Sequence, residues 1–137
     1  MKKLFTACVV GAAITLPSAD IYDAIAYVES EGNRYAIGDR GAAVGMYQIH
    51  KCYVDDVNRI ANTNYTYEDR TDPDKSREMV GIYLNYYGRN YVRTTGKQLT
   101  YEVLARIHNG GPYGYRKEST VEYWNKVKEA MNYDFCY

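Results

Sequence analysis

Glu29 and Asp39 are the two residues of this chain whose types and spacing could do chemistry together. Glu29 borders an apolar helical stripe, and Asp39 lies at the tip of a Gly-Asp-Arg-Gly turn. Apolar neighbours remove water from a carboxyl group, which favours its protonated form. Two acids in different environments are what acid-catalysed cleavage of a glycosidic bond requires. The pair therefore predicts a sugar-cleaving enzyme.

Each acid has a competing interpretation. Glu31 could replace Glu29 as the proton donor, but it lies nearer the end of the predicted helix, so we favour Glu29. Asp39 could simply fill a turn, which aspartate does for local reasons. Its participation in catalysis stays open at this point.

The helix that must carry Glu29 is predicted over residues 20–31. Ile21, Ala24, Ile25 and Val28 follow the spacing of one buried helical face. Asp20 can cap the start, and Gly32-Asn33 ends the helix. Residues 34–49 have no helical period and are punctuated by glycines, which predicts a small hairpin or β-like loop.

Four further helices follow in the sequence. We expect them over residues 50–61, from Pro73 to a stop at Gly88, over 100–108, and from Ser119 or Thr120 to about 131, with a loop over 89–98. Asp72-Pro73 starts the long one, and Ser119 with Glu122 forms a capping box for the last. The predicted fold is mainly α (α+β), with about five helices and a small hairpin or loop after the first.

Composition limits the function classes. The chain has 137 residues, and its 17 Lys and Arg balance its 17 Asp and Glu, so nothing indicates a nucleic-acid partner. No second composition zone appears, which predicts a single catalytic domain over residues 20–137 and a monomer. The 17 tyrosines suit either a sugar cleft or an ordinary small core.

Residues 1–19 resemble a signal peptide. Lys2 and Lys3 precede an apolar run that is shorter than the roughly 20 residues of a membrane span. We therefore expect a secreted or periplasmic protein without stable membrane insertion. Cleavage leaves Cys52 and Cys136, which would most simply pair in an oxidising compartment; two free thiols are the alternative.

Four short motifs resemble those of the lytic transglycosylases, members of the lysozyme-like superfamily. They occur in family order: ESEGNRYA at 29–36, GMYQI at 45–49, HNGGP at 108–112, and a tyrosine at 123 on the final helix. Met46-Tyr47 stands where the family has Leu-Met, and His108 stands where it has Tyr.

The resemblance implies a peptidoglycan-cleaving muramidase that acts on the β-1,4 bond between N-acetylmuramic acid and N-acetylglucosamine, without metal or cofactor. Glu29 would be the general acid/base. Ser30 would orient it or be an ordinary helix-end hydroxyl. The other substrate-binding residues that the resemblance implies are Gln48, Tyr47, Asn109, Tyr113 and Tyr123.

Whether Asp39 takes part in catalysis distinguishes hydrolysis from transglycosylation. Transglycosylases of this type use one glutamate and release an anhydro-sugar, whereas hydrolytic lysozymes commonly add an aspartate. We expect transglycosylation, with hydrolysis through Glu29 and Asp39, chitin-type cleavage, or a noncatalytic wall-binding protein as alternatives. His50 and His108 have no partners at metal-ligand spacing, so neither is assigned a role.

Overall fold

The computed structural model describes residues 20–135, and the predicted signal peptide and Cys136 lie outside this range. The described chain is mainly helical with a small antiparallel hairpin after the first helix, a lysozyme-like fold as predicted. The helices are α1 (Ile21–Ser30), α2 (Lys51–Ala61), α3 (Pro73–Thr95), α4 (Tyr101–Gly110) and α5 (Val121–Ala130). Among residues 20–135, no helix combines the length and apolar character needed to cross a membrane.

The predicted start of α1 is confirmed. The Asp20 carboxylate accepts a hydrogen bond of 2.8 Å from the backbone N–H of Asp23, which satisfies one of the free donors of the first turn. The helix ends where Glu31 adopts a left-handed φ of 53°. Ile21, Ala24 and Ile25 are buried on one face, so Glu29 is held beside the core.

The glycine-punctuated segment forms β1 (Ile37–Gly38) and β2 (Ala43–Val44), which pair antiparallel with Ile37 opposite Val44. A short 3-10 turn, η1 (Asp39–Gly41), connects the strands. The hairpin therefore places Asp39 at its tip, as expected.

The predicted stop of the long helix at Gly88 is wrong, because α3 continues through residues expected to form a loop and ends at Gly96 with φ 68°. Gly88 is buried, and an added Cβ would lie 2.9 Å from Leu99 Cδ2. The glycine thus permits close packing of α3 on the segment that precedes α4. The helix start was correct: Asp72 caps it, and Pro73 occupies its first turn.

The capping box predicted for the last helix is absent, because no side chain caps α5. The chain instead enters α5 through two short 3-10 turns, η3 (Gly114–Arg116) and η4 (Glu118–Thr120). The Thr120 hydroxyl is buried and accepts a 2.9 Å hydrogen bond from Arg106 Nε, so it ties this entry to α4.

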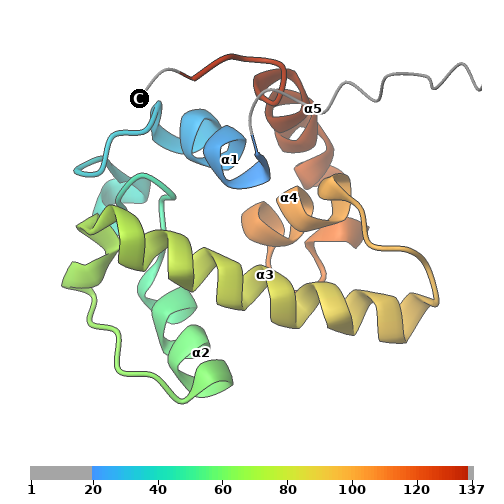
Figure 1. The fold of residues 1–137 in the computed structure, drawn as a ribbon, viewed down its shortest axis with the longest axis horizontal. Helices are drawn as coiled ribbons and strands as arrows, with labels where there is room; N and C mark the ends of the chain where they lie inside the picture. Colours follow the sequence, from blue (N-terminus) through green and yellow to red (C-terminus); the bar gives the residue numbers. More distant parts are fainter. Residues whose placement is uncertain (1–19, 136–137) are drawn as a thin grey trace, which may run out of the picture.

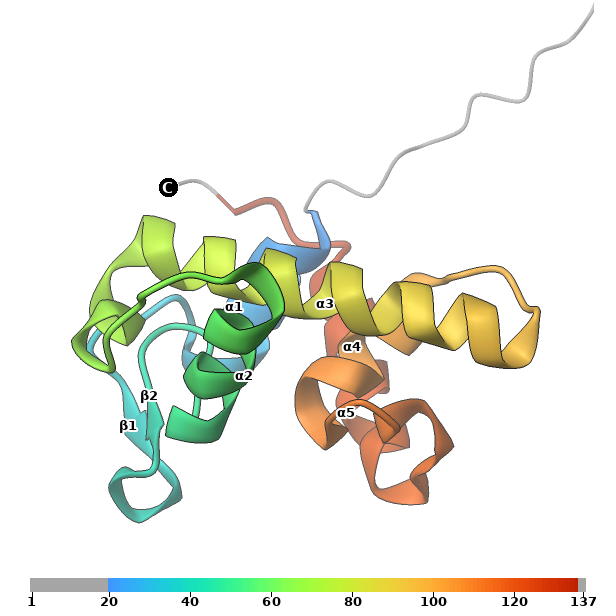
Figure 2. The ribbon, with the colours of Figure 1, turned by 90° about the horizontal axis from the view of Figure 1, so that it is seen from below.

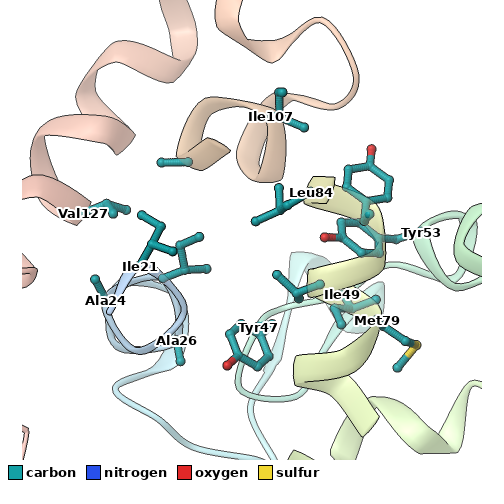
Figure 3. Packing of buried hydrophobic residues seen from close by; sticks show 14 of the residues in the cluster. Ile21, Ala24, Ala26, Tyr47, Ile49, Tyr53, Met79, Leu84, Ile107 and Val127 are labelled. Atoms are coloured by element: carbon teal, nitrogen blue, oxygen red, sulfur yellow. The ribbon is translucent and has the colours of Figure 1, made fainter. Parts of the chain in front are cut away.

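The other elements pack along α3 in two groups. Figure 1 shows α3 running across the molecule, and Figure 2 shows the hairpin and α2 below its N-terminal half, with α4 and α5 below its C-terminal half. Side chains from both groups meet along α3 in one apolar core (Figure 3). The core includes Ile21, Ile49, Leu84, Ile107 and Val127. Burying each such side chain contributes about 1.5–3 kcal/mol.

Candidate active site

A cavity of about 750 Å³ lies between the hairpin and α2 on one side and the end of α4 on the other. Both predicted acids, Glu29 and Asp39, contribute to its wall. The wall also includes Gln48 and His50 after the hairpin, and His108 and Asn109 at the end of α4. Its volume is in the range of ligand-binding clefts.

Glu29 projects from the last turn of α1, and its side chain is only 19% exposed. Its Oε1 accepts a hydrogen bond of 2.9 Å from the Tyr123 hydroxyl of α5. His108 lies on the other side, with Nε2 at 3.5 Å from the same Oε1. Three helices thus position one carboxyl group.

The pKa of Glu29 is raised from 4.5 to about 7, chiefly because burial removes water from the charged form. The hydrogen bond from Tyr123 opposes this rise, and the nearby charge of Asp39 adds to it. A carboxyl group with this pKa can hold a proton and release it near neutral pH, as a general acid must.

Asp39 lies in a different environment. Its side chain is 68% exposed, and Oδ2 lies 2.8 Å from Nε2 of His50. Asp39 and Arg40 both adopt left-handed φ angles, 46° and 56°. Such a backbone costs roughly 1–2 kcal/mol per residue, so the surrounding contacts must hold the turn in place. The two acids therefore differ in hydration, as the sequence predicted.

The segment after β2 braces the hairpin. Gln48 lies in the cavity wall, and its Nε2 donates to the carbonyls of Ala36 at 3.2 Å and Gly45 at 3.0 Å. A Cβ on Gly38 would lie 2.2 Å from Gln48 Oε1, so a larger residue there would displace the Gln48 amide. Gly45 likewise approaches protein rather than ligand, since its Cβ would lie 1.9 Å from the Arg70 carbonyl oxygen.

Two predicted substrate contacts take structural positions instead. Tyr47 is only 2% exposed, and its hydroxyl is bound by Arg77, so its ring does not line the cavity. Ser30 donates to the carbonyl of Met46 at 2.8 Å, which ties the end of α1 to the segment after the hairpin. Its hydroxyl therefore has the helix-end role rather than a direct contact with Glu29.

The remaining predicted residues divide between the cavity and its surroundings. Asn109 lines the cavity, and Tyr123 reaches Glu29. Tyr113 is 59% exposed outside the cavity lining, with the Arg116 guanidinium 5.2 Å from its ring centre. Cys52 lies exposed in the cavity wall and has no disulfide partner among residues 20–135; its predicted partner, Cys136, is outside the described residues.

Comparison with known proteins decides the family. The Destabilase family matches residues 18–130, most of the chain. The chain belongs to the Destabilase family.

Relatives of this Destabilase-family chain include invertebrate-type lysozyme 6 of Caenorhabditis elegans, which is 31% identical over 85% of the chain and 88% of that protein. A lysozyme of Ostrea edulis is 34% identical over 65% of the chain, a match that covers 61% of that protein. The fold resembles a chain in the crystal structure of Aeromonas hydrophila PliI in complex with Meretrix lusoria lysozyme, with a TM-score of 0.66 and 28% identity over 80% of this chain and 86% of that chain.

Membership of the lysozyme-like superfamily is therefore confirmed, but the narrower resemblance to lytic transglycosylases is not supported. The four motifs that suggested it are short: two surround the acid and the glycine-rich segment, and two lie at the end of α4 and in α5. Over the longer match, the Destabilase-family chain aligns with invertebrate-type lysozymes.

Sequence reasoning missed the two histidines of this Destabilase-family site. His50 contacts Asp39, and His108 contacts Glu29, so each acid has a histidine beside it. Their pairing depends on how the hairpin and α4 pack, and the one available signal was that His108 stands inside a recognised motif. Among residues 20–135, no group of His, Cys, Asp and Glu is arranged to hold a metal ion.

Proposed function

We propose that this chain is a hydrolytic lysozyme that cleaves the β-1,4 bond between N-acetylmuramic acid and N-acetylglucosamine in peptidoglycan. The observation that carries the proposal is the pKa of about 7 at Glu29, in a cavity whose wall also holds Asp39. The names of the relatives, which are lysozymes, support the same reaction class.

In the first step, protonated Glu29 donates its proton to the glycosidic oxygen. The bond between that oxygen and the sugar C1 breaks, and the electron pair leaves with the oxygen. Positive charge then develops at C1, where a carboxylate in the cleft stabilises it. Among the acids of the cavity wall, Asp39 is the one whose charge raises the pKa of Glu29, and we assign it this role.

In the second step, water attacks C1, and the Glu29 carboxylate takes the proton that the water releases. Glu29 returns to its protonated form, and the products are two shorter glycan chains, one with a new reducing end. A residue that changes from acid to base in this way needs a pKa near the working pH, which burial gives to Glu29.

Glu29→Gln tests the assignment of the acid. We expect clearing of purified peptidoglycan to fall by roughly 10²–10⁴-fold, the usual contribution of a general acid, because an amide cannot supply the proton. Glu31→Gln is the matched control, since Glu31 is exposed just beyond the helix and outside the cavity lining. A Glu29→Gln protein that folds and still clears peptidoglycan contradicts the proposal.

A comparison of two substrates tests the proposed substrate class. Wild-type protein is assayed on soluble peptidoglycan glycan fragments and on chitin oligosaccharides with the same number of sugars. We expect faster cleavage of the strands that contain N-acetylmuramic acid, and a clear preference for chitin contradicts the proposed substrate.

A further inference from the structure

The ring of His50 reaches from the start of α2 to the tip of the hairpin. Its Nε2 lies 2.8 Å from Oδ2 of Asp39, and both residues line the cavity. A carboxylate can only accept hydrogen bonds, so Nε2 carries a hydrogen and donates it to Oδ2. Within residues 20–135, no other acceptor shares that hydrogen, and no other protein hydrogen bond reaches the Asp39 carboxylate. Oδ1 is therefore left without a protein partner.

The backbone of His50 is fixed on both sides. Before it, Ile49 is buried and forms two backbone hydrogen bonds with Val44 of β2, at 3.0 Å and 3.1 Å. After it, the first turn of α2 begins, where the His50 carbonyl accepts from the N–H groups of Tyr53 at 3.1 Å and Val54 at 3.3 Å. The His50 side chain makes no capping bond to α2. The ring is therefore held in place and available to the hairpin.

The tip that carries Asp39 has few contacts of its own. No residue of η1 is buried, and a Cβ added at Gly41 would meet no atom within 4 Å. Asp39 and Arg40 also hold left-handed φ angles, which non-glycine residues adopt at a cost. A turn of this kind keeps one conformation only where outside contacts hold it, and the hydrogen bond from His50 is such a contact.

We propose that His50 is a positioning residue for Asp39: its Nε2–H holds Oδ2, so that Oδ1 stays in the cavity and meets the positive charge that develops at the sugar C1. His50 acts through Asp39 and does not itself contact the reacting atoms. The inference rests on the proposed function, because it concerns the carboxylate that the proposed mechanism places beside C1.

The hydrogen bond matters most when a glycan fills the cavity. In the free protein the Asp39 side chain is largely exposed, and an exposed pair holds a carboxylate only weakly. Because both residues line the cavity, a bound glycan displaces water from them and strengthens the bond. Asp39 then meets the charge at C1 without first having to reorient. Loss of the bond should therefore lower kcat and leave KM near its wild-type value.

Two substitutions at the same position provide the first test. His50→Phe keeps a ring and removes Nε2, so we expect kcat on soluble peptidoglycan fragments to fall roughly 3–10-fold with KM nearly unchanged. His50→Gln places an amide N–H at a comparable reach and should recover most of that loss. A His50→Phe protein with wild-type kcat, or a His50→Gln protein as slow as His50→Phe, overturns the proposal.

Lys51→Gln is the matched control. Lys51 follows His50, is exposed in the first turn of α2 and lies outside the cavity lining. We expect wild-type kcat and KM for this variant. A loss equal to that of His50→Phe would show that any change at the start of α2 lowers activity, which contradicts the positioning role.

A double-mutant cycle with Asp39→Asn separates positioning from folding. If His50 acts through the Asp39 carboxylate, adding His50→Phe to Asp39→Asn should lower kcat by less than about twofold further. An effect as large as in the wild-type background would mean that His50 acts on the fold, and the proposal would be wrong. Activity that survives Glu29→Gln contradicts the proposed function itself, whereas an inactive Glu29→Gln protein with an additive cycle contradicts only the role of His50.

Nitrogen NMR of the wild-type protein adds a readout that needs no variant. The shifts of the two imidazole nitrogens distinguish the position that carries the hydrogen. At a pH where the ring is neutral, we expect the hydrogen of His50 on Nε2. A ring that carries its hydrogen only on Nδ1 cannot donate to Asp39 and overturns the proposal.

Discussion

At the scale of single residues, the candidate site holds two carboxyl groups in different environments. Glu29 is buried against α4 and α5, which raises its pKa to about 7. Asp39 is exposed on the hairpin turn beside His50. Glu29 lies on α1 and Asp39 on the hairpin turn, so either side chain can be substituted without changing the position of the other.

Asp39→Asn tests the role of the second acid. We expect kcat on peptidoglycan to fall roughly a hundredfold, because the positive charge at the sugar loses its carboxylate. The charge of Asp39 also raises the pKa of Glu29, so its removal should move the basic limb of the pH profile to lower pH. A variant with unchanged rate and profile would show that Asp39 is only a turn residue.

Burial of Glu29 also predicts how stability depends on pH. Its pKa is 4.5 when exposed and about 7 in the fold, so the folded state holds its proton more tightly. Its contribution to stability is complete below pH 4.5 and is lost as the pH rises through 7. The loss amounts to roughly 3 kcal/mol, at about 1.4 kcal/mol per pKa unit.

Urea unfolding of wild type and Glu29→Gln at several pH values checks this dependence. The variant should gain stability over wild type between pH 5 and pH 8, with little difference at pH 4. A constant difference across the range would mean that Glu29 is not buried as described.

The burial of Glu29 was predictable from sequence, because its helical register beside Ile25 and Val28 places it at the edge of the core. Tyr123 was singled out only through the family resemblance, as a substrate-binding residue, and its hydrogen bond to Glu29 emerges from the packing of α5. The contacts of His50 and His108 were not predictable, since they depend on how separate elements pack. Tyr47 was misassigned for the same reason: its ring points into the core beside α3 (Figure 3), which no local pattern reveals.

At the scale of elements, the hairpin is held from outside rather than by its own two short strands. Arg70 is buried in η2 (Glu68–Thr71) and donates from Nη1 to the carbonyls of Ile49 at 3.1 Å and Ala42 at 3.3 Å. Gly45 packs directly on the backbone of Arg70. The position of Asp39 therefore depends on the fit between Gly45 and Arg70.

Gly45→Ala and Gly41→Ala form a matched pair for this element. Both glycines have positive φ, 86° and 96°, but a Cβ at Gly45 would lie 1.9 Å from the Arg70 carbonyl oxygen, whereas Gly41 faces open space. We expect Gly45→Ala to lower the free energy of unfolding by about 3 kcal/mol or more, and Gly41→Ala by about 1 kcal/mol. Equal losses in urea unfolding would contradict the packing role of Gly45.

The starts of α1 and α3 were predictable because their signals are local: Asp20 and Asp72 each accept a hydrogen bond from a backbone N–H three residues ahead. The end of α3 was not, because Gly88 is equally compatible with a helix stop and a close contact. Only the approach of Leu99 and Leu104 shows that tertiary packing overrides the local preference.

At the scale of the whole molecule, two groups of elements pack along α3 (Figure 2), and each group contributes residues to the cavity wall. The hairpin and α2 bring Asp39 and His50, and the end of α4 brings His108. Glu29 reaches the cavity from α1, and its contacts with α4 and α5 hold it beside the shared core. The whole fold is thus needed to make one carboxyl group an acid near neutral pH.

Digestion of peptidoglycan in heavy-oxygen water tests the central claim, hydrolysis through Glu29, most directly. Water supplies the oxygen at each new reducing end in hydrolysis, whereas transglycosylation forms an internal anhydro bond and takes up none. Mass spectrometry of the products should therefore show one heavy oxygen for each bond cleaved by wild type, and no cleavage by Glu29→Gln. Unlabelled anhydro-muropeptides as the main product would contradict the account.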